Sequence, residues 1–329
     1  MKPRVFVTRH VYPQAIAVLQ EDCVVDYRDR YEVPDQAALT RKLQLADGVV
    51  CQLTDPLTAA VIDAAPQLKV IAQVAVGHDN IDVAAATRRG IVVTNTPGVL
   101  TEATADLTFA LLLAVARRLP TAERWLRDGK WQRWDVDLLC GSDVHGRTLG
   151  LVGFGRIGQA VAARARGFGM RVLYAGRSAA PAERERDLGA RRVPLDTLLH
   201  ESDFVSLHVP LTPETRHLIG VEQLCQMKRS AFLINTARGA VVDEAALVAA
   251  LEEGLLAGAG LDVFEDEPRV HPGLLALDNV VLLPHVGSAV HSVRGLMCAI
   301  AARECAAVLR GDRPQHAVNP EVFERRENR

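Results

Sequence analysis

The chain has 329 residues, 49 % of them apolar and 24 % charged, which is enough for two domains with sizeable buried cores. Its formal net charge of −2 gives no long-range attraction to nucleic acid or to an acidic membrane surface. No stretch reaches the roughly 18 uncharged apolar residues of a membrane span, and the N-terminus lacks the apolar run of a secretory signal. The six cysteines include no CxxC pair, so with that N-terminus they predict a reducing, cytoplasmic location, and no metal site is expected.

Short apolar runs alternate with helical patterns over the first 100 residues, which is typical of a parallel α/β unit. Strands are predicted at 5–8, 24–27, 48–53, 69–77 and 91–95, and helices near 13–20, 35–45, 58–64 and 82–88. Thr101 can then cap a long helix over 101–119, which is apolar nearly all round and should be buried between layers. The stretch 120–146 is richer in Trp, Arg and Gly, which indicates an excursion from the domain body.

A second series of short apolar strands begins after this excursion. Six are predicted, at 148–155, 171–175, 203–209, 231–236, 258–263 and 280–284. Strands that are almost continuously apolar are covered on both faces, and six of them with helices between match a doubly wound dinucleotide-binding fold. A last helix is expected over about 288–310, followed by a polar tail over 321–329 that should be frayed.

The first strand of this second series leads into Gly153-x-Gly155-x-x-Gly158 at the start of a helix. Gly153 suits a tight turn, Gly155 lets backbone approach a pyrophosphate, and Gly158 lets the helix pack close to the strand. The N-terminus of the helix offers free N–H groups and a positive dipole end to the phosphates. The motif therefore predicts a dinucleotide site; the alternative is a tight strand-to-helix turn without a ligand.

The next strand ends at Gly176, where such sites usually carry an acidic residue for the ribose hydroxyls. Glycine removes the charge that would repel a 2′-phosphate, while Arg177 supplies a cationic fork and Ser178 a hydroxyl. The strand end therefore predicts NADP(H) as the preferred cofactor, with NAD(H) possible. The alternative is that Arg177 is an ordinary surface residue and the acidic partner lies elsewhere.

Three later segments each begin as an apolar strand and end in polar residues, at 233–247, 259–268 and 282–288. In an open α/β sheet the carboxyl ends of the strands face the ligand, so Arg238, Asp262, Glu267 and His285 should converge.

Six segments of this chain resemble the D-isomer-specific 2-hydroxyacid dehydrogenase family, and within it the glyoxylate/hydroxypyruvate reductases. They are VGHDNIDV (76–83), GFGRIG (153–158), PLTPETRHLI (210–219), NTARGAVVDEAAL (235–247), LDVFEDEP (261–268) and PHVGSA (284–289). The resemblance implies two doubly wound parallel-sheet domains. Residues 1–100 and 289–329 would form a flavodoxin-like substrate domain, and 101–288 a Rossmann NAD(P)-binding domain with a dimerisation arm at about 120–146.

The chemistry of reducing a 2-oxo acid explains the catalytic residues that the resemblance implies. Arg238 can bind the substrate carboxylate or polarise the ketone through its planar, permanently charged fork. Protonated His285 can donate a proton to the forming alkoxide as the hydride arrives. Glu267 can hydrogen-bond the other ring nitrogen, which orients the imidazole and favours its protonated form. Taken singly, Glu267 could be a solvated turn residue and His285 a loop histidine.

The resemblance also implies further contacts. The substrate would be bound by Leu53, Val76, Gly77, Arg238 and Ser288. Together with the glycine loop and the strand end, the expected cofactor contacts are Thr104, Gly153, Phe154, Gly155, Arg156, Ile157, Gly158, Gly176, Arg177, Ser178, Val209, Pro210, Thr215, Thr236, Ala237, Arg238, Asp262, His285 and Gly287. Asp262 would contact the nicotinamide carboxamide, or else be a structural helix cap. His78 and Asn80 are expected to stabilise a loop.

The expected activity is NADPH-preferring reduction of a short 2-oxo acid, glyoxylate or hydroxypyruvate, because no charged residue near Leu53, Val76 or Ser288 can hold a longer substrate. A 2-ketogluconate reductase is the alternative. Phosphite dehydrogenases resemble this chain but carry a lysine where it has Val76. A corepressor-like protein that senses dinucleotide would retain the same motifs.

The segment 126–146 resembles the arm that members of the family exchange across a two-fold dimer, which predicts a homodimer. Trp131 and Trp134 would anchor this arm. Leu138 replaces a tryptophan that some glyoxylate reductases send toward the partner's pocket. The alternative is a surface loop pinned by its own tryptophans.

Overall fold

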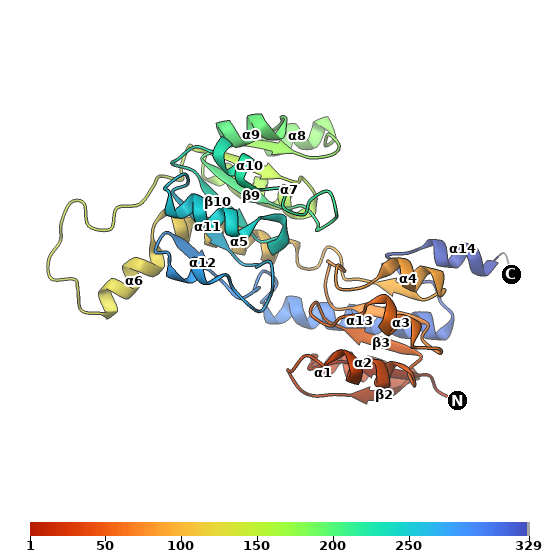
Figure 1. The fold of residues 1–329 in the computed structure, drawn as a ribbon. Coiled ribbons are helices and arrows are strands. Elements are labelled where there is room, and N and C mark those ends of the chain that lie inside the picture. Colours follow the sequence, from red (N-terminus) through yellow and green to blue (C-terminus); the bar gives the residue numbers. More distant parts are fainter. Residues whose placement is uncertain (328–329) are drawn as a thin grey trace. The chain divides into compact units, whose positions relative to one another are not determined.

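The computed structural model describes residues 1–327, which form two compact units (Figure 1). One unit joins Met1–Leu100 to the chain from Ala289 onward, and the other is Thr101–Ser288. Each is built on one wholly parallel sheet, so the predicted α/β fold class is confirmed. No helix in the described part of the chain is long and apolar enough to cross a membrane.

The first unit contains five short strands in the order β2-β1-β3-β4-β5. They are β1 (Arg4–Val7), β2 (Val24–Tyr27), β3 (Gly48–Cys51), β4 (Val70–Gln73) and β5 (Val92–Thr94). All five were predicted, but β3 and β4 end earlier than expected, because the apolar runs continue into the loops that follow them. This is the strand order of flavodoxin-like sheets, with the switch point between β1 and β3.

Helices cover both faces of this sheet, as the apolar strands require. Phe6 on β1 packs toward α2 (Gln36–Leu43), α3 (Ala59–Asp63) and α4 (Val83–Arg88). Its neighbours Val5 and Val7 pack toward α1 (Pro13–Asp22) and α13 (His291–Arg310) on the other face. The helix predicted from about residue 288 begins three residues later, at His291.

The chain after α13 packs back on the first sheet, and the polar tail that was expected to be frayed is helical over 321–327. Asn319 is fully buried; its Oδ1 accepts the Val93 amide at 2.8 Å and its Nδ2 donates to the Ile91 carbonyl at 2.9 Å. These bonds cover the edge strand β5. The helix α14 (Glu321–Glu327) follows and buries Val322; residues 328–329 lie outside the described part.

The second unit contains seven parallel strands in the order β12-β11-β10-β9-β6-β7-β8. They are β6 (Thr148–Val152), β7 (Arg171–Ala175), β8 (Ala190–Arg192), β9 (Phe204–Leu207), β10 (Phe232–Asn235), β11 (Gly258–Leu261) and β12 (Val280–Leu282). Six were predicted. The edge strand β8 was missed because it is three residues long and two of them are arginines. The strand order reverses between β6 and β9, which is the switch point of a dinucleotide-binding fold.

Two layers of helices enclose this sheet. One face carries α5 (Thr101–Ala116), α7 (Arg156–Gly167) and α8 (Ala182–Leu188). The other carries α9 (Leu195–Glu201), α10 (Val221–Gln226), α11 (Glu244–Glu252) and α12 (Pro272–Ala276).

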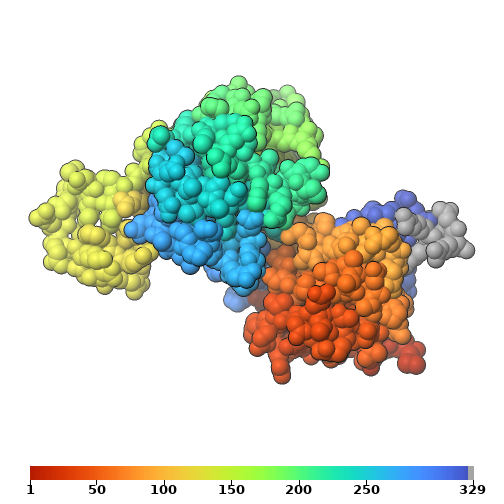
Figure 2. Space-filling model, in the orientation of Figure 1, coloured from red at the N-terminus to blue at the C-terminus, as the bar shows by residue number. Residues whose placement is uncertain are grey.

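The predicted helix over 101–119 is two helices. The first, α5, ends at Ala116, Arg118 takes a left-handed conformation with φ of 53°, and α6 (Leu119–Arg127) starts anew with Pro120 in its first turn. Pro120 cannot donate the hydrogen bond that a continuous helix needs. Helix α6 and the irregular segment to residue 146 project from the rest of their unit (yellow in Figures 1 and 2), as predicted for the excursion.

Candidate active site

The glycine loop joins β6 to α7, and its backbone leaves no alternative to glycine at two positions. Gly153 has φ of +98°, and a Cβ there would meet the His208 carbonyl oxygen at 2.6 Å. A Cβ on Gly158 would lie 2.5 Å from the Gly153 carbonyl oxygen. A Cβ on Gly155, in contrast, would meet nothing within 4 Å, although Gly155 is the N-cap of α7. The open space beside Gly155, at the amide-rich end of a helix, fits the pyrophosphate of a dinucleotide.

Tyr174, at the end of β7, holds the chain that follows the strand. Its ring is fully buried and stacks on Phe154 of the glycine loop, with centroids 4.1 Å apart. Its hydroxyl donates to Glu185 at 2.7 Å and accepts the Ala180 amide at 2.8 Å. Gly176, Arg177 and Ser178 lie between these anchors, and their side-chain positions are exposed. The stack of Tyr174 on Phe154 therefore links the glycine loop to the turn that is predicted to receive a 2′-phosphate.

His208 was missed by the sequence analysis, and it lies beneath the glycine loop. Burial lowers the pKa of its ring to about 4, so it is uncharged at neutral pH. Its Nε2 lies 2.9 Å from the Ser206 hydroxyl. The signal in the sequence is its place directly after an apolar strand and before the Val209–Pro210 bend.

Arg238 follows β10 in a segment held by its own side chains and by close packing. The Asn235 amide group donates to the Arg238 carbonyl at 2.9 Å, and its oxygen accepts the Ala237 amide at 3.0 Å. Gly239 lies directly against the backbone of Phe264, where a Cβ would be 1.8 Å from the carbonyl carbon. This contact fixes the strand-end segments of β10 and β11 side by side, and with them the backbone that carries Arg238.

Glu267 and His285, which are 18 residues apart in the chain, form the predicted pair. The Nδ1 of His285 lies 2.8 Å from Glu267 Oε2, and Glu267 Oε1 accepts the Phe264 amide at 3.0 Å. Burial disfavours the charged carboxylate, but the His285 bond and charge, the Phe264 amide and the Arg238 charge outweigh burial and lower the pKa of Glu267. Because the carboxylate occupies Nδ1, the opposite nitrogen Nε2 is the one left for proton transfer to a substrate.

Asp262, at the end of β11, anchors the loop that carries His285. It is 1 % exposed, and its two carboxylate oxygens accept the Val286 and Gly287 amides, each at 2.8 Å. Its carbonyl accepts the His285 amide, also at 2.8 Å. Burial raises the pKa of the carboxyl, although the Val286 amide, the His285 charge and the Gly287 amide act in the opposite direction. Asp262 therefore caps a loop, and the alternative of a helix cap is wrong.

Replacing Asp262 with asparagine should destabilise the protein by about 2–3 kcal/mol, because one buried amide would face the new NH₂ group instead of an oxygen. Urea unfolding at neutral pH measures the change. The matched control is Asp266→Asn, a carboxylate that is 67 % exposed and should change stability by less than about 0.5 kcal/mol. Equal stabilities for the two variants would contradict this role of Asp262.

Replacing Glu267 with glutamine should lower kcat by about 10- to 100-fold, because an amide orients the imidazole but does not stabilise its positive charge. Since the folded pKa of Glu267 is lowered, its contribution to stability is present above the ordinary glutamate pKa and is lost as the pH falls through the lowered value. The variant and the wild type should therefore differ in stability at neutral pH and converge in acid. Glu265→Gln, two residues away, is the control; an equal loss of kcat there would refute the assignment.

Of the other predicted cofactor residues of this unit, Thr215 and Thr236 lie in strand-end loops and Thr104 lies on α5. The hydroxyl of Thr215 donates to the Pro210 carbonyl at 2.6 Å and accepts the Thr212 amide at 2.8 Å, which braces the loop after Val209. The hydroxyl of Thr236 lies 2.8 Å from that of Thr108 on α5. Thr104, one turn earlier on α5, donates to the Gly287 carbonyl at 3.3 Å. Ser288 is the next residue and ends the unit.

The predicted substrate residues of the first unit follow the carboxyl ends of β3 and β4. Asn80 joins their two loops: its Nδ2 donates to the Gln52 and Asp55 carbonyls at 3.1 and 2.9 Å, and its Oδ1 accepts Gln73 Nε2 at 2.7 Å. Asn80 therefore stabilises the loops that carry Leu53, Val76 and Gly77, as expected. The buried Nδ1 of His78 has no hydrogen-bond partner among the residues that the structure describes, so this nitrogen does not brace the loop.

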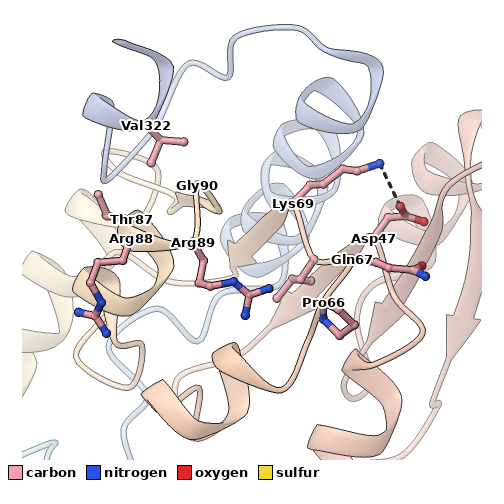
Figure 3. Close-up of a pocket in the computed structure, with 10 residues that line it drawn as sticks. Asp47, Pro66, Gln67, Lys69, Thr87, Arg88, Arg89, Gly90 and Val322 are labelled. Carbon is pink, nitrogen blue, oxygen red and sulfur yellow. Dashed lines mark hydrogen bonds and ion pairs between the residues drawn. The ribbon is translucent and has the colours of Figure 1, made fainter. Parts of the chain in front are cut away.

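A separate pocket of about 580 Å³ lies in the first unit, at the amino ends of β3, β4 and β5 (Figure 3). Three of its charged groups, Asp47, Lys69 and Arg89, are already paired within the protein. Lys69 Nζ lies 3.1 Å from Asp47, and Arg89 donates to the carbonyls of Ile62, Asp63 and Ala65. None of the predicted site residues lines this pocket, so it is not part of the candidate active site.

The sequence is similar to known dehydrogenases and reductases. A family model described as "D-isomer specific 2-hydroxyacid dehydrogenase, NAD binding domain" matches residues 109–287. The chain is 54 % identical to a glyoxylate reductase of Korarchaeum cryptofilum over 98 % of its own length and 97 % of the relative's, and 50 % identical to one of Thermococcus litoralis over 98 % of both.

Two solved structures are similar in fold and sequence. A protein of Thermus thermophilus has a TM-score of 0.89 at 49 % identity, covering 96 % of this chain and 99 % of that one. An NADPH-dependent glyoxylate/hydroxypyruvate reductase from Sinorhizobium meliloti, in complex with NADP and malonate, has a TM-score of 0.88 at 38 % identity and covers 97 % of both chains.

Proposed function

Since this chain belongs to the D-isomer-specific 2-hydroxyacid dehydrogenase family, an NAD(P)-dependent class of oxidoreductases, we propose that it reduces glyoxylate or hydroxypyruvate to the 2-hydroxy acid with NADPH. The observation that carries the proposal is the Glu267–His285 pair, 2.8 Å apart at the carboxyl ends of the second unit's strands. Reduction of a 2-oxo acid is also the activity named for its relatives.

The residues of the chain divide the work of this reaction. A bound reduced nicotinamide would supply the hydride for the substrate's carbonyl carbon, and the carbonyl oxygen would take up a proton. The Nε2–H of protonated His285 gives its proton to that oxygen, and Glu267 balances the imidazolium charge until then. Arg238 binds the substrate carboxylate through its guanidinium. The neutral imidazole regains its proton from solvent after turnover.

The preference for NADPH rests on the turn after β7. Gly176 offers no carboxylate to repel a 2′-phosphate, and Arg177 and Ser178 supply a cation and a hydroxyl at the exposed end of the strand. A relative with 38 % identity is named NADPH-dependent and is solved with NADP.

The deciding experiment is kcat/KM for glyoxylate, hydroxypyruvate and 2-ketogluconate with NADPH and with NADH. We expect a short 2-oxo acid to be the best substrate and NADPH to be preferred by about tenfold or more, the value of one charge-assisted hydrogen bond. A clear preference for NADH would refute the cofactor proposal, and faster reduction of 2-ketogluconate would favour the alternative substrate. Absence of turnover with every substrate would favour a dinucleotide-sensing role.

We also propose that the protein is a homodimer through its arm. Trp131, Trp134 and Val136 are 56 %, 76 % and 81 % exposed, so the tryptophans do not pin the loop to its own chain. Exposed apolar groups of this size on a projecting segment are typical of an interface between subunits. Sedimentation should give a dimer; a monomer at micromolar concentration would contradict the proposal.

A further inference from the structure

Two neighbouring arginines on the edge strand β8 serve different purposes. In the parallel pairing of β7 with β8, Arg191 lies opposite Leu173 and Arg192 opposite Tyr174, and successive side chains of a strand point to opposite faces. Arg191 turns toward α9, where its Nη2 lies 3.7 Å from Glu201. Arg192 turns toward the end of β7, where its Nη2 donates to the Gly176 carbonyl at 2.8 Å and to the Arg177 carbonyl at 3.3 Å.

These two bonds place the Arg192 guanidinium at the turn that replaces the usual acidic residue. Only Nη2 is occupied, since Nε and Nη1 have no hydrogen-bond partner within the described residues, and the side chain is exposed. A guanidinium carries five N–H donors in a rigid fork that matches phosphate oxygens. Three donors and the full positive charge are therefore left at Gly176, while the bonds to the two carbonyls stiffen the backbone that presents Arg177 and Ser178.

The acidic groups around the turn favour a second cation for binding a dianion. Glu214 lies on the loop after β9, and the positive charge of Arg177 acts on its carboxylate. The pKa of the Glu214 carboxyl is lowered by the Thr212 hydroxyl, by its own backbone amide and by Arg177. Arg177 is thus partly balanced by a carboxylate of the same chain. The other nearby acid, Glu185, accepts the hydroxyl of Tyr174. With Arg192 counted, the corner holds two guanidinium groups beside two carboxylates.

We infer that Arg192 is a specificity-determining residue for NADPH, the second cation of the 2′-phosphate site beside Arg177. This inference rests on the cofactor preference proposed above and adds the residue that sets its strength. Arg192 acts on the phosphate in two ways: it supplies N–H donors from the flank of the turn, and it holds the Gly176 and Arg177 carbonyls away from the anion.

The test compares Arg192→Gln with Arg191→Gln, which removes the same charge from the neighbouring position on the opposite face of β8. Dissociation constants for NADPH and NADH are measured by quenching of protein fluorescence. Arg192→Gln should weaken NADPH binding by about tenfold and change NADH binding by less than about twofold, because NADH lacks the phosphate. Arg191→Gln should leave both constants within about twofold of the wild type, and Arg192→Lys, which keeps the charge but loses the fork, should be intermediate.

Two results would overturn the inference. One is a loss of NADPH affinity in Arg192→Gln no greater than in Arg191→Gln. The other is an equal loss for NADPH and NADH, which would make Arg192 only a brace of the turn. The cofactor preference itself fails on a different measurement, namely wild-type kcat/KM favouring NADH, and a selective effect of Arg192→Gln on NADPH would still be visible in that case.

Discussion

Replacing His285 with asparagine should lower kcat for glyoxylate reduction by roughly 10²- to 10⁴-fold, the usual contribution of a general acid. Asparagine is the appropriate replacement because His285 has φ of +52°, and asparagine adopts this left-handed region more readily than most residues. The backbone bond from residue 285 to the Asp262 carbonyl and the two amide bonds to the Asp262 carboxylate do not involve the ring. The loss of rate therefore reports the missing proton donor and not a displaced loop.

Steady-state kinetics with saturating NADPH measures the effect, and NADPH affinity and urea unfolding serve as controls. We expect NADPH affinity to stay near the wild-type value. Urea unfolding should show only the loss of the hydrogen bond between His285 and Glu267, about 1 kcal/mol, with the fold retained. A His285→Asn variant that keeps more than about a tenth of the wild-type kcat would remove His285 from the role of acid. Combined with Glu267→Gln, the losses should be less than additive, since Glu267 acts through the imidazole.

The sequence predicted the parts of the site that depend on local pattern. The glycine loop is recognisable because it lies between an apolar strand and a helix, and the packing of Gly153 and Gly158 shows why no other residue fits there. Glu267 and His285 could be assigned to one edge because all parallel strands of a sheet end on the same side. Their 2.8 Å contact could not, because it depends on how the loops after β11 and β12 are anchored by Asp262.

The sequence analysis missed strand β8, Arg192 and His208 because no local hydrophobic pattern marks their structural role. Strand β8 reads Ala-Arg-Arg, so nothing in its hydrophobicity marks it as a strand, and only pairing with β7 defines it. Without β8 there was no reason to bring Arg192 to Gly176, 16 residues earlier. His208 was missed for a different reason: its burial comes from the packing of β9 beneath the glycine loop, which is a tertiary contact. The break between α5 and α6 did have a signal, since Pro120 follows the left-handed Arg118 by two residues.

Introducing aspartate at Gly176 should reverse the cofactor preference. A Cβ at this position meets only the Ser178 carbonyl oxygen, at 3.9 Å, and the backbone φ is not in the left-handed region, so the side chain can be accommodated without strain. The new carboxylate would repel the 2′-phosphate and accept hydrogen bonds from the ribose hydroxyls of NADH. It would also lie beside the Arg192 guanidinium, which is bound to the carbonyl of the same residue, and so pair with the cation that NADPH needs.

We expect kcat/KM with NADPH to fall by about 100-fold in Gly176→Asp, equivalent to roughly 2.7 kcal/mol, and kcat/KM with NADH to rise several-fold. Gly176→Ala is the matched control, because it adds the same Cβ without the charge and should change either value by less than about threefold. Similar losses in both variants would mean that space at Gly176 matters and its charge does not. Retention of the NADPH preference by Gly176→Asp would place the 2′-phosphate away from this turn. Glycine at this position has two consequences for the cofactor: it leaves space, and it adds no negative charge. Gly176→Ala removes only the space. Gly176→Asp removes the space and also places a carboxylate beside Arg177 and Arg192, so comparing the two variants separates the effects.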